Sequence, residues 1–153
     1  MDFPSIPNEF VDGAISFNSV DVELPELDQT SLSTWLSAVA KTYNTSIHQL
    51  SYVLCSDAYL HAMNVERLSH DTLTDIITFD LRDSESAPIE GECYISIDRV
   101  MDNAASFGES TEVEFLRVVV HGLLHLCGLG DKTPEESERM RIAEDSALKM
   151  LVN

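Results

Sequence analysis

Basic residues are scarce in this chain. Nine Lys and Arg stand against 27 Asp and Glu among 153 residues, which gives a formal net charge of −18. Nucleic-acid binding usually depends on Lys and Arg that neutralise phosphates, so this charge argues against a broad basic surface for a polyanion. No DNA partner is expected. Eight of the nine basic residues lie between Arg67 and Lys149, which leaves room for a local positive surface there.

The chain also lacks the usual features of secreted and membrane proteins. Cys55, Cys93 and Cys127 are odd in number and form no CxxC pair, which argues against a disulfide framework. No stretch approaches the roughly 20 apolar residues that a membrane span requires. Residues 1–12 contain acidic residues but no Lys or Arg, unlike the start of a signal peptide. We therefore expect a cytoplasmic protein without an export signal or a membrane partner.

No repeat or low-complexity linker divides the sequence, and its length suits one domain with a buried core, so we predict a single domain over residues 1–153. Periodicity and turn residues predict one or two edge strands at 14–24, further strands at 47–55, 75–81 and 92–97, and helices at 31–43, 56–63, 98–107, 111–127 and 134–151. The expected N-terminal caps are Thr30 or Ser31, Ser56, Asp98 and a Thr111–Glu114 capping box. This order predicts an α+β domain with a mixed four-stranded sheet, helices mainly on one face and a metal-binding helix.

Two histidines interrupt the apolar run of the helix predicted at 111–127. His121 and His125 are separated by about 40° around the helix axis and by one turn along it. Both imidazoles therefore project from one face and can share one metal ion. The alternative is a pair of core histidines bonded to backbone carbonyls. We favour the metal, because a buried imidazole needs a partner for each ring nitrogen and a metal supplies one.

A catalytic zinc usually has three protein ligands, and the third is expected where the chain turns back after the helix. Asp131 lies there, beyond two glycines at 128 and 130 that allow the backbone to reverse. Its carboxylate is an acceptable zinc ligand; the alternative is an ordinary aspartate in a turn. Cys127 lies about 200° further round the helix than His125, so we interpret it as a small core residue.

The residue after the first histidine excludes one class of zinc enzyme. Peptidases with an HExxH helix carry a glutamate at this position as general base, whereas this chain has Gly122. Peptide hydrolysis by that mechanism is therefore disfavoured.

Segment 121–131 (HGLLHLCGLGD) resembles the HGxLHLxGxxH signature of the YbeY family, endoribonuclease-like factors of ribosomal RNA maturation. Segments 73–79 (LTDIITF) and 91–96 (GECYIS) resemble the PTDVLSF and GDIxIS strands of that family. The acidic C-terminal helix is also similar, at Glu136 or Glu138, Met140 and Glu144. The resemblance extends from Tyr52 to Leu151.

Two positions depart from the family pattern. The third histidine of the signature falls on Asp131, so the resemblance implies a His121, His125 and Asp131 site with a harder ligand than imidazole. An arginine expected six residues before the threonine of the TD strand falls on Leu68. The neighbouring Arg67 is our candidate to replace it as the catalytic residue that faces phosphate, and an exposed arginine at a helix end is the alternative. His70 is a further candidate for the cleft.

The resemblance implies an endoribonuclease with one Zn²⁺ per chain. Its expected substrate is single-stranded RNA near the 3′ end of small-subunit ribosomal RNA, cleaved by a metal-activated water or at a metal-polarised phosphodiester during ribosome biogenesis. Because the chain is acidic, we expect it to bind ribosomal RNA with the help of a ribosome-bound partner protein. The alternatives are a metallopeptidase-like hydrolase and a non-catalytic assembly factor in which the metal only fastens the helix to the turn.

Overall fold

The computed structural model describes residues 14–68 and 74–151. Strands and helices follow one another in the predicted order βαβαββααα. In chain order they are β1 (Ala14–Ser19), α1 (Gln29–Thr42), β2 (Ile47–Cys55), α2 (Asp57–Leu68), β3 (Ile76–Asp80), β4 (Ile89–Ser96), α3 (Ile97–Phe107), α4 (Thr111–Leu126) and α5 (Pro134–Lys149). Among the described residues, no helix is both long and apolar enough to cross a membrane.

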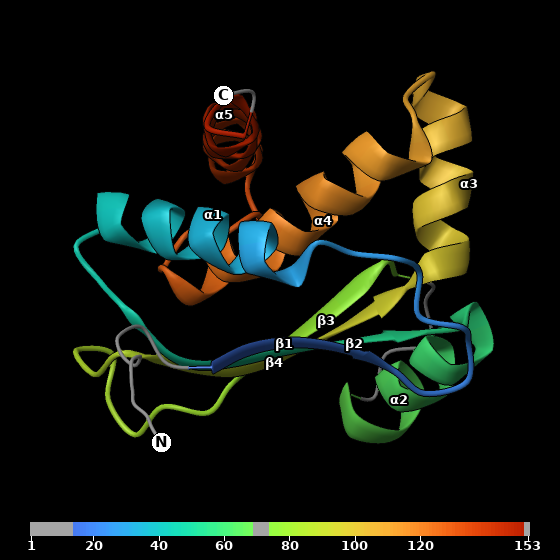
Figure 1. Cartoon of the computed structure of the whole chain (residues 1–153), viewed down its shortest axis with the longest axis horizontal. Helices are drawn as coiled ribbons and strands as arrows, with labels where there is room; N and C mark the ends of the chain where they lie inside the picture. Colours follow the sequence, from blue (N-terminus) through green and yellow to red (C-terminus); the bar gives the residue numbers. More distant parts are fainter. Residues whose placement is uncertain (1–13, 69–73, 152–153) are drawn as a thin grey trace.

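The four strands form one sheet in the order β1-β2-β4-β3 (Figure 1). Strands β1, β2 and β4 run parallel, whereas β3 runs antiparallel to β4. The polar connection between β3 and β4 therefore closes a hairpin and places β3 at the edge of the sheet. This arrangement confirms the predicted mixed four-stranded sheet.

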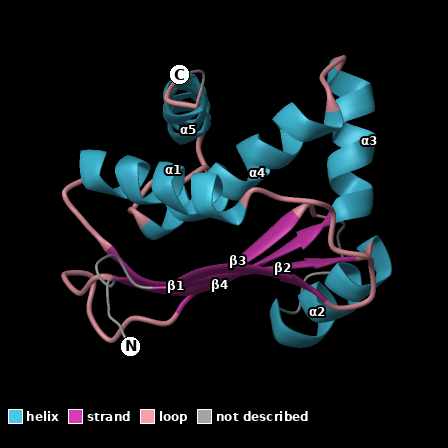
Figure 2. Ribbon diagram, viewed as in Figure 1, coloured by secondary structure: helices cyan, strands magenta, loops and turns pink. Residues whose placement is uncertain are grey.

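The helices lie mainly on one face of the sheet, as predicted (Figure 2). Helices α1 and α4 cover that face, α5 lies above them, and α2 lies on the opposite face (Figure 1). The main hydrophobic core fills the space between the sheet, α1 and α4. The buried indole of Trp35 on α1 donates a hydrogen bond to the carbonyl of Ala147 on α5 (2.8 Å), which joins the two outer helices.

Helix α4 packs unusually close to β3 and β4 because Gly122 faces the sheet. A Cβ atom at this position would lie 2.8 Å from Sγ of Cys93 and 2.9 Å from Cδ1 of Ile76. Only a residue without a side chain leaves room for this approach. The close approach holds the adjacent turn of α4, which carries His121 and His125, above the edge strand.

Several predicted element ends were wrong by a few residues. Only Ala14–Ser19 of the first apolar segment forms a strand, and β4 begins at Ile89, earlier than predicted. The N-caps of α1, α3 and α4 are Asp28, Ser96 and Ser110, in place of the predicted Thr30 or Ser31, Asp98 and Thr111. In each case an upstream side-chain oxygen accepts the backbone N–H three residues later, which satisfies an unpaired donor of the first turn.

Candidate metal centre

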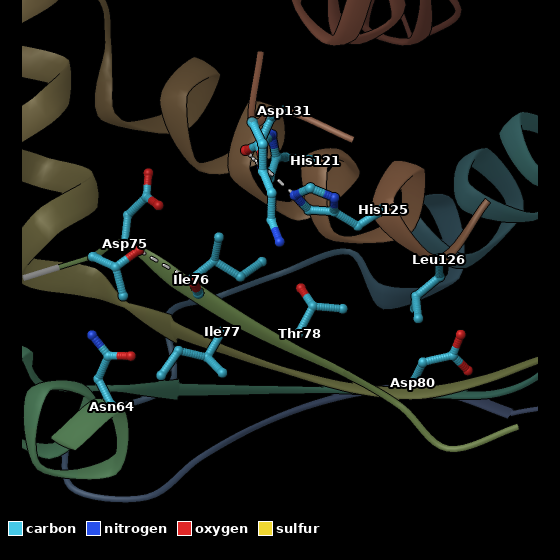
Figure 3. A pocket seen from close by; sticks show the side chains of 12 residues that line it. Asn64, Asp75, Ile76, Ile77, Thr78, Asp80, His121, His125, Leu126 and Asp131 are labelled. Atoms are coloured by element: carbon cyan, nitrogen blue, oxygen red, sulfur yellow. Dashed lines mark hydrogen bonds and ion pairs between the residues drawn. The ribbon is translucent and has the colours of Figure 1, made fainter. Parts of the chain in front are cut away.

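Three side chains predicted as metal ligands meet above β3. The potential ligand atoms of His121, His125 and Asp131 all lie within 4.8 Å of one another. Oδ2 of Asp131 lies 3.4 Å from Nε2 of His121 and 3.5 Å from Nε2 of His125. Figure 3 shows the two imidazoles on successive turns of α4 with Asp131 beside them.

The local sequence explains this convergence. Helix α4 ends at Leu126, and Gly128 adopts a positive φ of 105°, a backbone conformation that favours glycine and reverses the chain. At Gly130 a Cβ atom would lie only 2.8 Å from Oε1 of Glu136. The same Oε1 accepts the backbone N–H of Lys132 (3.0 Å), which holds the turn against the start of α5. Asp131 is thereby returned to the histidines.

The Nδ1 atom of each histidine is engaged, so that each Nε2 is left for a ligand. Nδ1 of His125 lies 2.9 Å from the carbonyl oxygen of Leu129, and Nδ1 of His121 lies 2.6 Å from Oε2 of Glu144. Because a carbonyl oxygen can only accept, Nδ1 of His125 carries the hydrogen, and Nε2 of the neutral ring has a free lone pair. The carboxylate of Glu144 favours the same tautomer in His121.

Buried charges on α4 and α5 hold Glu144 in place. Nη1 of Arg117 donates to Oε1 of Glu144 (3.1 Å), and Nη2 of Arg117 lies 2.9 Å from Oδ1 of Asp145. The side chain of Arg117 is only 11% exposed, so it is a structural partner of α5 and is poorly placed to meet RNA. Both carboxylate partners of Arg117 come from α5, which packs over this turn of α4.

The charges around His121 determine its protonation in the metal-free protein. Burial disfavours the charged imidazole, but the hydrogen bond and negative charge of Glu144, together with Asp131 and Asp75, outweigh it and raise the pKa of His121 above 6.5. Burial also raises the pKa of Asp75, against the opposing effect of His121. A proton and a metal ion therefore compete for the His121 ring as the pH falls through this raised pKa.

The cluster opens into a cavity of about 630 Å³. Polar residues from α2, from β3 and the two residues before it, and from the turn before α5 line it beside the metal ligands, namely Asn64, Thr74, Asp75, Thr78, Asp80 and Lys132. Sequence reasoning did not assign Asp75 a role, although it is the aspartate of the TD strand motif. Its carboxylate accepts a hydrogen bond from Nδ2 of Asn103 (3.3 Å) and lies close enough to His121 for their charges to interact.

The two distances between Asp131 and the histidines are compatible with a shared metal ion such as zinc. Zinc bonds to nitrogen and carboxylate oxygen are about 2.0–2.2 Å long, so ligand atoms of a tetrahedral site are separated by about 3.3–3.6 Å. The two distances from Asp131 match this separation. If all three side chains bound the ion, a tetrahedral metal would keep a fourth position for water or substrate, as in catalytic zinc sites.

Cys127 does not belong to the ligand set. It is the C-cap residue of α4 and is absent from the cluster that could hold a metal among the described residues. Burial raises the pKa of its thiol to about 11, so the sulfur is protonated at neutral pH and is a poor ligand. This position agrees with its interpretation as a packing residue.

Arg67 lies apart from the three metal ligands. It is exposed in the last turn of α2, with its guanidinium carbon 6.0 Å from the ring centroid of Phe79. The Phe79 ring packs on the α2 side of the sheet, whereas Gly122 contacts Ile76 and Thr78 on the other side. A catalytic role for Arg67 therefore stays a prediction. His70 lies outside the described residues.

Comparison with known proteins identifies the family of the chain. The sequence profile of the YbeY family, described as endoribonuclease YbeY, matches residues 14–152. A protein named endoribonuclease YbeY from Cytophaga hutchinsonii is 45% identical to this chain, over 89% of this chain and 94% of that protein. Another of the same name, from Flavobacterium johnsoniae, is 42% identical over 89% of this chain and 96% of its own length. A third, from Parabacteroides distasonis, is 41% identical over 90% of this chain and 96% of its own length.

The fold is also similar to a solved structure. The solution structure of TM1509 from Thermotoga maritima superposes with a TM-score of 0.59 at 25% sequence identity, covering 90% of this chain and 91% of that one. The family profile spans the described fold, including the three clustered residues, and the relatives cover about nine-tenths of the chain. The chain therefore belongs to the YbeY family.

Proposed function

We propose that this protein is a zinc-dependent, single-strand-specific endoribonuclease that matures the 3′ end of small-subunit ribosomal RNA during ribosome biogenesis. The observation that carries the proposal is the convergence of His121, His125 and Asp131 at an open cavity, in a chain whose relatives are named endoribonuclease YbeY. The RNA substrate and the zinc are inferred from the family and from the ligand chemistry.

The protein groups around the ion have separable roles in this proposal. Zinc held there would supply Lewis acidity for phosphodiester hydrolysis. His121 and His125 would hold the ion through Nε2, while Glu144 and the carbonyl of Leu129 keep both rings in the binding orientation. Asp131 would complete the ligand set as a carboxylate, which partly neutralises the ion and is a harder ligand than imidazole.

The charge of −18 bears on how the substrate reaches the site. An acidic surface repels free RNA, so we propose that ribosomal RNA is met on the ribosome, with a ribosome-bound partner protein. Three free thiols, Cys55, Cys93 and Cys127, support a reducing compartment, and we propose the cytoplasm.

The test combines metal analysis with cleavage assays. We expect about one zinc per purified chain, lost in His121→Ala and in His125→Ala. Cleavage of a single-stranded RNA should disappear with the zinc, while a duplex of the same sequence and an unstructured peptide remain intact. A purified protein that contains no transition metal and takes up none at neutral pH would rule out the site.

Two alternatives give different results in the same assays. A non-catalytic assembly factor would lose stability on zinc removal and cleave no RNA at any metal occupancy. A peptidase-like hydrolase would cleave the peptide. Its HExxH form is disfavoured by Gly122, because contact with Cys93 and Ile76 leaves no space there for the general-base glutamate; a peptidase with Asp131 or a neighbouring acid as base is decided by the peptide assay.

A further inference from the structure

Arg82 makes a buried contact that its position in a polar loop does not suggest. It lies two residues after β3, in the connection to β4, yet its side chain is only 9% exposed. Nε donates to Oδ1 of Asp80 (2.9 Å), and Nη2 donates to Oδ2 of the same carboxylate (2.6 Å). This two-point geometry fixes the plane of the guanidinium.

The fixed guanidinium also reaches the end of the metal-binding helix. Nη2 of Arg82 donates to the carbonyl oxygen of Leu126 (2.8 Å), the last residue of α4. The final four carbonyls of a helix lack intrahelical partners and carry partial negative charge, so a cation here both satisfies an acceptor and complements the helix dipole. The contact spans 44 residues of sequence and joins the end of β3 to the end of α4.

The Leu126 carbonyl that accepts from Arg82 lies, in sequence, between the candidate ligands His125 and Asp131. Leu126 directly follows His125, and the turn after it supplies the Leu129 carbonyl that holds Nδ1 of His125 and then Asp131. Asp80 and Leu126 both line the cavity beside the cluster. Movement of the helix end would therefore displace His125, its hydrogen-bond acceptor and Asp131 relative to His121.

We propose that Arg82 is a positioning residue of the metal centre. By joining Asp80 to the Leu126 carbonyl, it holds the end of α4 so that His125 and Asp131 keep ligand distance from His121. The inference rests on the metal-binding part of the proposed function and is independent of the RNA substrate.

The test compares zinc affinity with the stability of the metal-free protein. In Arg82→Gln, zinc affinity measured by chelator competition should fall about 10–100-fold, the usual effect of removing an outer support of a metal site. The melting temperature of the metal-free variant should fall no more than that of the control, Arg99→Gln. Arg99 is a suitable control because it also pairs with two carboxylates, those of Asp57 and Asp102, and the substitution removes the same charge. Zinc affinity of the control should match that of the parent.

A second variant covers the case in which Arg82→Gln does not fold. Arg82→Lys keeps the charge but cannot span all three acceptor atoms, so its zinc affinity should fall severalfold. Parental zinc affinity in either folded Arg82 variant, or an equal loss in Arg99→Gln, would overturn the proposal. Zinc binding by the parent protein distinguishes the two ways in which the test can fail. A parent that binds no zinc refutes both the metal site and the role of Arg82. An Arg82 variant with parental zinc affinity refutes only the role of Arg82.

Discussion

Asp131 is the residue at which this chain departs most from the family signature, and its position makes that departure testable. Its Oδ2 atom lies 3.4 Å from Nε2 of His121 and 3.5 Å from Nε2 of His125. Asp131→Ala should therefore weaken zinc binding strongly, while Asp131→His should retain it with a softer ligand. Chelator competition on the three proteins measures this difference. Parental affinity in Asp131→Ala would mean that the third ligand lies elsewhere.

Glu144 gives a second prediction for a single residue, one concerning pH. Its carboxylate hydrogen-bonds Nδ1 of His121, which contributes to a pKa of this histidine above 6.5 in the metal-free protein. Zinc affinity should therefore begin to fall as the pH drops through that raised pKa, where the proton displaces the metal. In Glu144→Gln the pKa of His121 should fall, so the loss of affinity moves to lower pH, and affinity at high pH decreases about tenfold.

The same linkage affects the folding of the metal-free protein. Because the pKa of His121 is higher in the folded state than in the unfolded state, its interaction with Glu144 stabilises the fold fully below about pH 6.5, the ordinary histidine value. This contribution is lost as the pH rises through the raised pKa. Imidazole resonances followed by NMR across this range would report the titration directly, and an unshifted His121 in the parent would contradict the assignment.

Packing between α4 and the sheet leads to a prediction for these elements. Gly122→Ala should gain about 1 kcal/mol of helix propensity but place a Cβ atom within 3 Å of Cys93 and Ile76. Overpacking of this kind costs about 1–3 kcal/mol, so we expect a net loss of stability, measured by urea unfolding of the metal-free protein. A gain in stability would show that the sheet can move away at little cost.

A double mutant tests whether this contact is the cause. Cys93→Ala removes the sulfur that a Cβ atom at position 122 would meet at 2.8 Å. Combining it with Gly122→Ala should therefore destabilise the protein less than the sum of the single changes, because the two sites are in contact. If the stability losses of the two single variants simply add in the double mutant, contact with the Cys93 sulfur is not the cause of the destabilisation.

The molecule as a whole is negatively charged and repels RNA. Its affinity for RNA must therefore come from a few groups near His121, His125 and Asp131. We expect binding to free single-stranded RNA to be weak at physiological salt, as measured by fluorescence anisotropy. Tight binding that is insensitive to salt would contradict this expectation and indicate a neutral recognition surface.

Arg67 tests how far the RNA path extends around the molecule. Its guanidinium lies over Phe79 on the α2 side of the sheet, so a strand that touches both Arg67 and His121 must cross the β3 edge. We predict that Arg67→Ala reduces RNA cleavage while zinc content is unchanged, and that Arg139→Ala, another exposed arginine, leaves both unchanged. If Arg67→Ala cleaves RNA as well as the parent, the RNA strand contacts only the face of the sheet that α4 covers.

Sequence alone determined the parts of this protein that depend on local periodicity. The 3.6-residue repeat places His121 and His125 on one face, and a glycine turn of a few residues returns Asp131 to them, so the cluster could be predicted without a partner element. Element order and the mixed sheet followed from the alternation of strand and helix patterns. Periodicity did not determine the helix ends, because several Ser, Thr and Asp residues compete for each cap.

Tertiary structure decided which distant residues support the ligands. Glu144 reaches His121 across 23 positions, and Arg82 reaches the Leu126 carbonyl across 44, because α5 and the β3–β4 connection pack against α4. The placement of Arg67 on the opposite side of the sheet likewise depends on the position of β3 at the edge. Such contacts depend on how whole elements pack, and neither helical nor strand periodicity contains that information, since each describes only one element at a time.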